Sequence, residues 1–235
     1  MLFRSASNLS QITTPEGTVS SFWDDANVSE MDTAINVYPT HATDALVFAS
    51  VGQQGIRSSG TKPNYTTNFS GYNRYHMFVV INPSAVNAGV GVTYYADKIV
   101  SDNLGGGGDG AYFTIGLTED GIGAYRVIHH TYGSGHDVAY LPLASLNVPI
   151  VIEAKKNESG IAIALNGGTF SAYTPSVGPG LTNMGFSFGS AIVFGNYFKG
   201  KFHEFRVHAN TSITDEERQA TIDRKSTRLN SSHRL

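Results

Sequence analysis

From Ala45 onward the chain alternates between short apolar runs and clusters of Gly, Asn, Asp and Pro. Runs of about 4 to 8 residues that are rich in Val, Ile, Phe and Tyr and bounded by such clusters are typical of β-strands. No stretch of this region sustains the 3.6-residue apolar period of a helix. The pattern predicts strands at 45–51, 76–82, 91–96, 111–117, 123–130, 137–141, 150–155, 161–165, 185–188 and 201–208.

Two tight hairpins are the clearest local signals in this region. Thr118–Gly121 and Asn157–Gly160 each join two predicted strands and place Gly where a positive φ is needed. The strands on either side of the second turn alternate apolar and polar residues, as half-buried strands do. By contrast, Met77–Ile81 is apolar on both faces, which indicates a central strand. The chain is therefore predicted to be all-β, a sandwich of two antiparallel sheets.

The two ends of the chain differ from this pattern. Residues 1–43 are polar with little periodicity and predict an irregular N-terminal segment, ahead of a sandwich domain at 44–222. Thr214 with Glu217 forms a capping box, which predicts a short helix from Asp215 to about Ile222. Residues 223–235 resemble a translated sequencing adapter and are expected to be an artefactual disordered tail on a gene fragment; the alternative is a genuine basic, Ser-rich tail.

Composition narrows the classes of function. The 235 residues include no cysteine, which excludes disulfides and cysteine-ligated metals. Sixteen Lys and Arg against 19 Asp and Glu give a net charge of −3, which becomes −6 without residues 223–235. An acidic balance argues against nucleic acid as a partner. No run of 18 apolar residues is present, so membrane insertion is not expected.

Three stretches carry a family resemblance. They are Tyr94–Leu117, Pro149–Gly167 and Gly195–Arg218, the last containing Gly-Lys-Phe-His-Glu-Phe-Arg-Val-His followed by Ile-Thr-Asp-Glu-Glu. In this order they resemble the concanavalin A-like lectin/glucanase superfamily, in particular its laminin G-like (pentraxin/LamG-type) domains. The resemblance implies a jelly-roll β-sandwich closed by a short C-terminal helix, and a carbohydrate-binding role.

Two segments match the spacing of a nucleotide-binding or catalytic motif but lack the helix that should follow it. Gly105–Gly110 fits G-x-G-x-x-G, but a strand and not a helix is expected after it, so nucleotide binding is not predicted. Gly185–Gly189 fits G-x-S-x-G, yet no helical pattern follows the serine. Glycanases of this fold commonly carry E-x-D-x-x-E, and this spacing is absent. No catalytic residue is assigned, and the chain is not expected to be an enzyme.

Two groups of residues are candidates for binding. Histidines, aromatics and an acid near the predicted strand 123–130 could line a sugar site; this ligand-binding set is Tyr95, His130, Tyr132, His136 and Asp137. Acids and an amide around the Gly-rich loop could hold calcium, or could be solvated loop residues; this set is Asp97, Asp102, Asn103 and Asp109. A zinc site on His129 and His130 is disfavoured, because adjacent strand residues point to opposite faces. No cofactor is expected, with calcium the alternative.

These observations predict a non-catalytic, extracellular adhesion domain that binds carbohydrate or another cell surface. Its expected context is a phage tail, another virion appendage or a bacterial surface protein, with cell-surface glycans and neighbouring subunits as partners. Two alternatives stay open. A structural virion module would show a broad apolar surface, and a polysaccharide lyase or glycoside hydrolase would show two titratable groups in one cleft.

Overall fold

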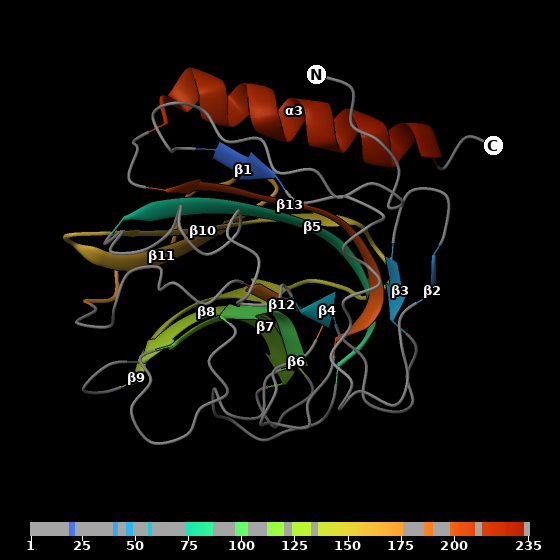
Figure 1. Ribbon diagram of the computed structural model, residues 1–235, viewed down its shortest axis with the longest axis horizontal. Helices are drawn as coiled ribbons and strands as arrows, with labels where there is room; N and C mark the ends of the chain where they lie inside the picture. Colours follow the sequence, from blue (N-terminus) through green and yellow to red (C-terminus); the bar gives the residue numbers. More distant parts are fainter. Residues whose placement is uncertain are drawn as a thin grey trace.

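The computed structural model describes residues 19–21, 40–41, 46–48, 56–57, 74–86, 97–102, 112–119, 124–132, 136–175, 186–189, 198–209 and 213–232. These residues form two antiparallel sheets stacked face to face, with one helix lying across the outside of the larger sheet (Figure 1). The prediction of a two-sheet β-sandwich is confirmed. No helix in this described part is both long and apolar enough to cross a membrane.

The larger sheet has the order β11-β10-β5-β13-β3-β2, with β1 also pairing with β13. Its strands are β1 (Val19–Ser21), β2 (Thr40–His41), β3 (Leu46–Phe48), β5 (Tyr75–Ala85), β10 (Ile150–Asn157), β11 (Gly160–Leu165) and β13 (Lys199–Ala209). The smaller sheet has the order β4-β12-β6-β7-β8-β9. Its strands are β4 (Ile56–Arg57), β6 (Asp97–Asp102), β7 (Tyr112–Glu119), β8 (Tyr125–Tyr132), β9 (His136–Leu143) and β12 (Phe186–Phe188).

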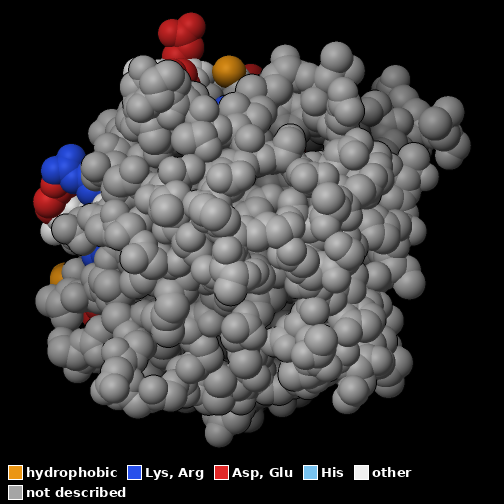
Figure 2. Space-filling model, in the orientation of Figure 1, with side chains coloured by type: hydrophobic (Ala, Val, Ile, Leu, Met, Phe, Trp, Pro, Cys, Tyr) orange, Lys and Arg blue, Asp and Glu red, His pale blue; other side chains and the backbone are white. Residues whose placement is uncertain are grey.

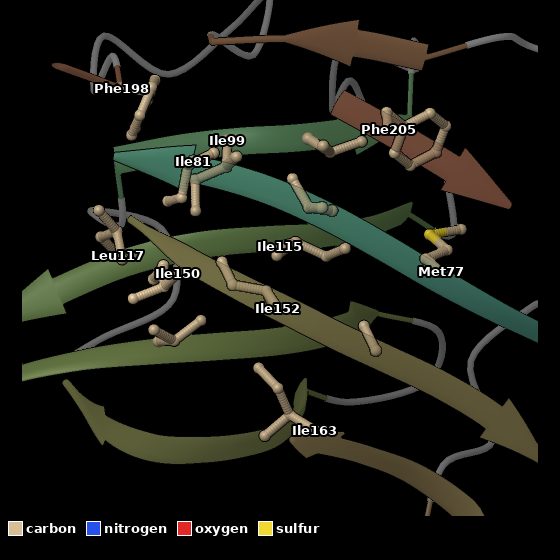
Figure 3. Close-up of a cluster of buried hydrophobic side chains, with 14 of the residues drawn as sticks. Met77, Ile81, Ile99, Ile115, Leu117, Ile150, Ile152, Ile163, Phe198 and Phe205 are labelled. Atoms are coloured by element: carbon tan, nitrogen blue, oxygen red, sulfur yellow. The ribbon is translucent and has the colours of Figure 1, made fainter. Parts of the chain in front are cut away.

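The main core lies between the two sheets, and strand alternation builds it. Met77, Val79 and Ile81 of β5 point inward, as do the alternate residues Ile150 and Ile152 of β10. Side chains from the smaller sheet meet them from the other side (Figure 3). Apolar area removed from water in this way contributes roughly 25 cal/mol per Å², so this layer is the chief source of stability.

A second, smaller cluster explains why β5 is apolar on both faces. Phe78 and Val80 point away from the main core and pack with Val151 of β10 and Ile222 of the helix α3 (Asp215–Ser232). The helix begins at the predicted capping box, in which Glu217 N–H donates to Thr214 Oγ1 at 3.1 Å and Thr214 N–H donates to Glu217 Oε2 at 2.8 Å. Figure 2 shows acidic side chains projecting over this end of the helix.

Arg218 links α3 to the larger sheet through hydrogen bonds to Glu153 of β10. Its guanidinium donates to both oxygens of Glu153, with Nε to Oε2 at 2.7 Å and Nη2 to Oε1 at 2.8 Å, and Nη2 also reaches Gly168 O at 2.8 Å. Glu153 is fully buried and also accepts from His76 Nε2 at 3.3 Å. Burial raises the pKa of Glu153, but the bonds from His76 and Arg218 outweigh it and leave the pKa below its usual range.

Five elements differ from the sequence predictions. One is β4 (Ile56–Arg57), a strand where none was predicted. Residues 19–21 and 40–41 pair into the larger sheet, so the segment 1–43 is not wholly irregular. Asp97–Asp102 is a strand where a loop was expected, and the predicted strand 91–96 lies outside the described residues. α3 continues to Ser232, past the expected end at Ile222, so residues 223–232 are helical and not a disordered tail.

Candidate functional site

The outer face of the smaller sheet carries the predicted residue His130. In β8, Val127 and His129 point into the sandwich, so His130 occupies the opposite face. His130 pairs with Thr114 of β7 and with Val138 of β9. His130 and Thr114 are both buried, whereas Val138 is partly exposed. Solvent therefore reaches this face most freely on the side of the edge strand β9.

The most exposed aromatic side chain on this face is Tyr140, among the side chains that the structure describes. Tyr140 is 52% exposed and lies in the row next to His130 and Val138. The guanidinium carbon of Arg126 lies 4.8 Å from the centre of the Tyr140 ring, a cation–π contact. Thr118 and Pro142 pair with Arg126 on either side of it in the register; Thr118 is partly exposed and Pro142 is exposed. Together they form a patch, hereafter the Tyr140 patch, of an aromatic ring, a cation and a hydroxyl.

Tyr132 and His136 are brought together by the register. They are paired residues at the end of the β8–β9 ladder, and Tyr132 also pairs with Tyr112 of β7. This row lies next to the row of His130. Tyr95, the remaining aromatic of the predicted ligand set, lies outside the described residues.

Asp137, by contrast, is separated from the other predicted ligand residues. It pairs with Thr131 of β8, and this row alternates with that of His130 and Val138, so it belongs to the core side of the sheet. Burial lowers the pKa of Lys156, and the negative charge of Asp137 raises it by less. The pKa of Lys156 therefore lies below its usual value. Asp137 is therefore part of an interior polar cluster, because a one-residue step along a strand reverses the face.

The same interior cluster contains a tyrosine–histidine pair. Tyr75 Oη lies 2.8 Å from Nε2 of His129, and Nδ1 of His129 lies 3.2 Å from the carbonyl oxygen of Ala162. Because a carbonyl only accepts, Nδ1 carries the proton and Nε2 accepts from the tyrosine hydroxyl. Burial lowers the pKa of His129 to about 4, so the ring is neutral at pH 7. Both side chains are buried, which makes them structural partners and not contacts for a large ligand.

The predicted calcium ligands do not converge in the described part of the chain. Asp97 is fully buried on the core side of β6, opposite Leu117, and Asp102 is at the other end of the same strand. Five steps of about 3.3 Å separate their backbones by roughly 16 Å, too far for one ion. Asn103 and Asp109 lie outside the described residues. Within that part no three His, Asp or Glu residues are grouped closely enough to hold a metal.

Arg126 and Tyr140 were missed by the sequence analysis, although a signal for them exists. Both lie an even number of residues from a predicted site residue on their own strand, Arg126 four before His130 and Tyr140 four after His136. Alternation alone therefore places each of them on the same face of its strand as that predicted site residue. The contact between them depends on the register of β8 against β9, which the sequence does not reveal.

Comparisons with known proteins find similarity in fold. No family model matches the chain, and no curated protein matches it. Among solved structures, Trypanosoma rangeli sialidase in complex with the inhibitor DANA is similar with a TM-score of 0.52 and 16% identity, over 76% of this chain and 27% of that chain. The Ruminococcus gnavus IT-sialidase CBM40 bound to α2,3-sialyllactose gives a TM-score of 0.49 and 16% identity, over 70% of this chain and 94% of that chain.

A third similar structure is domain 4 of a GH43 extracellular arabinanase from Geobacillus stearothermophilus, in complex with arabinotriose. It gives a TM-score of 0.49 and 13% identity, over 74% of this chain and 73% of that chain. The chain spans less than a third of the sialidase chain that it matches. At 16% identity, structural similarity to the sialidase establishes a shared fold and nothing about function. The shared fold is the antiparallel β-sandwich described above.

Proposed function

We propose that this protein is a non-catalytic carbohydrate-binding domain that contacts its ligand through the Tyr140 patch. The observation that carries the proposal is the exposed Tyr140 ring on the outer face of a sheet, beside Arg126 and the hydroxyl of Thr118. Aromatic rings pack on the apolar faces of sugars, while hydroxyls and guanidinium groups bind sugar oxygens. The resemblance to carbohydrate-recognition domains is consistent with this role.

The distribution of carboxylates supports binding without catalysis. Glycoside hydrolysis generally uses two carboxylates that flank one glycosidic bond. In the described strands of the smaller sheet, no Asp or Glu occupies an outer-face position. The Tyr140 patch therefore lacks, within those strands, the pair of acids that a hydrolase would need.

The described surface gives less support to a purely structural module. Such a module would bury a broad apolar surface against neighbouring subunits. The exposed large hydrophobic residues in the described part of the chain are Tyr140 and Val148. We propose that the domain acts in adhesion, on a virion appendage or a bacterial surface protein, where a cysteine-free module with a single recognition face would suffice.

A glycan array with the full chain tests the proposed function. We expect the wild-type chain to bind at least one class of glycan and Tyr140→Ala to bind it about tenfold more weakly, because a stacked ring contributes roughly 1 kcal/mol or more. Val148→Ala is the matched control: Val148 is 48% exposed and lies outside the Tyr140 patch. Circular dichroism checks that both variants fold. No binding by the wild type, or equal binding by Tyr140→Ala, would refute the proposal.

A further inference from the structure

A tight turn that follows β11 contains the one Asn-Gly pair of the sequence, Asn166 and Gly167. Gly168 N–H donates to Leu165 O at 2.9 Å, and Asn166 and Gly167 have positive φ values of 51° and 76°. These features define a type I′ turn, for which Asn-Gly is the preferred central pair. Asn166 is exposed, so solvent reaches its side chain.

The side-chain amide of Asn166 is held in a polarised state. Its Oδ1 accepts the Val151 N–H at 2.8 Å, while the Asn166 N–H donates to Val151 O at 2.8 Å. The bond to Oδ1 draws electrons away from Cγ. It also places a donor at the oxygen that becomes negative when a nucleophile adds to that carbon. The folded protein therefore makes Cγ of Asn166 a better electrophile.

The nitrogen of Gly167 is placed to act as the nucleophile. Gly167 N–H donates to no acceptor among the residues that the structure describes. The residue follows Asn166 directly, and from this position addition to Cγ closes a five-membered ring. Glycine has no Cβ to obstruct the approach. An unbonded nitrogen and a polarised carbon are thus neighbours in the chain.

We infer that Asn166 is a site of spontaneous deamidation through a cyclic imide. A base in the solvent removes the Gly167 amide proton, the nitrogen forms a bond to Cγ of Asn166, and Nδ2 leaves as ammonia. Water then opens the imide at either carbonyl, which gives aspartate or isoaspartate at position 166. The net reaction converts an amide and water into an acid and ammonia, so water is the only co-reactant.

The same turn supports α3, so this modification acts beyond its own position. A Cβ built on Gly167 would lie 3.2 Å from Cγ2 of Ile222, and Gly168 O accepts from Arg218 Nη2 at 2.8 Å. Isoaspartate lengthens the main chain of the turn by one atom and shifts both glycines relative to α3. The isoaspartate form should therefore hold α3 less tightly. The aspartate form should keep its stability, because its carboxylate still accepts the Val151 N–H.

Peptide mapping by mass spectrometry tests the inference on the full chain, incubated at pH 7 and at pH 8 for increasing times. The matched control is Asn147 in the same sample, which is also exposed and has φ of 61° but is followed by Val148. A β-branched residue obstructs ring closure. We expect the amide-to-acid mass shift at Asn166 and none at Asn147. The rate should rise up to about tenfold per pH unit, as the fraction of deprotonated amide does.

Urea unfolding measures the effect on α3. Aged wild-type chain that contains isoaspartate should have a lower urea midpoint than fresh chain, whereas fresh Asn166→Asp should match fresh wild type. Asn166→Gln, aged in parallel, controls for changes elsewhere and should keep its own midpoint, because Gln would have to close a six-membered ring.

No conversion at Asn166, or equal conversion at Asn147, would overturn the inference. Equal midpoints of aged and fresh wild type would overturn the link to α3. An equal loss in fresh Asn166→Asp would assign the effect to charge and contradict the role of chain lengthening.

Discussion

At the scale of single residues, the interior polar cluster shows how burial fixes a charge state. His129 is held between Tyr75 and the Ala162 carbonyl, which together fix its neutral tautomer. His76, on the other face of the larger sheet, also has a lowered pKa because burial outweighs its bond to Glu153. In the unfolded chain both rings would titrate near pH 6.5. Both therefore oppose folding as the solution becomes acidic.

The pH dependence of stability tests the state of His129. Its folded pKa of about 4 lies below the unfolded value of 6.5, so its contribution is complete above pH 6.5 and is lost as pH falls towards 4. Between pH 7 and pH 5 the loss should be about 2 kcal/mol. We expect His129→Gln, which cannot titrate, to lose correspondingly less stability over that interval in urea unfolding. Parallel losses in the wild type and the variant would contradict this account.

At the scale of elements, sequence patterns predicted correctly the turns, strands and caps that depend on residues close together in the chain. The Asn157–Gly160 turn, the inward apolar face of β10 and β11, and the Thr214–Glu217 cap were all found as predicted, although β10 and β11 are buried on both faces and not half-buried. β6 was missed, because the clusters of Asp and Gly around it resemble a loop and its inward Asp97 breaks the apolar pattern. The strands β1, β2 and β4 have two or three residues each, too few to show a period.

The β10–β11 turn provides a test at this scale. Gly160 has φ of 120°, and a Cβ built on it would lie 1.9 Å from the Thr174 carbonyl oxygen. Gly160→Ala should therefore lower the free energy of unfolding by about 3 kcal/mol or more, because backbone strain and a steric clash with the backbone combine. Gly167 is the matched control: it also has a positive φ, 76°, but its Cβ would meet only the Ile222 side chain at 3.2 Å.

Gly167→Ala should cost about 1 kcal/mol, the usual penalty for a left-handed residue. Urea midpoints of the two variants measure the difference. Equal midpoints would show that the contact between Gly160 and Thr174 does not constrain the turn.

At the scale of the whole molecule, the two sheets have different exteriors. α3 covers the apolar outer face of the larger sheet. The described side chains that hold it there are Ile222 and Arg218 of the helix and Ile213 just before it. The candidate site belongs to the other sheet, and Figure 1 shows α3 and the strands β8 and β9 on opposite sides of the sandwich. Sequence patterns predicted the sandwich, but His130, which they offered as a ligand contact, is fully buried. They could not predict the Tyr140 patch, since strand order and register depend on the packing of the complete chain.

Truncation tests the role of α3 in this arrangement. A chain that ends before Ile213 would leave Glu153 buried without Arg218 and expose Phe78 and Val80, so we expect it to lose roughly 3 to 5 kcal/mol of stability or to aggregate. A chain that ends at Ile222 keeps these contacts and is the control. Thermal unfolding and binding of a hydrophobic dye distinguish the two. Equal stability would contradict the assigned role.

The position of α3 has a consequence for how a partner can reach the protein. The helix lies over the outer side of the larger sheet, where Ile222 packs on Phe78 and Val80, and its first turn carries the exposed acids Asp215, Glu216 and Glu217. A partner that approaches from that side meets acidic groups before it meets a strand. At the edge of the smaller sheet, β9 instead presents Tyr140 directly to solvent, so the two sides of the sandwich offer different chemistry to an approaching molecule.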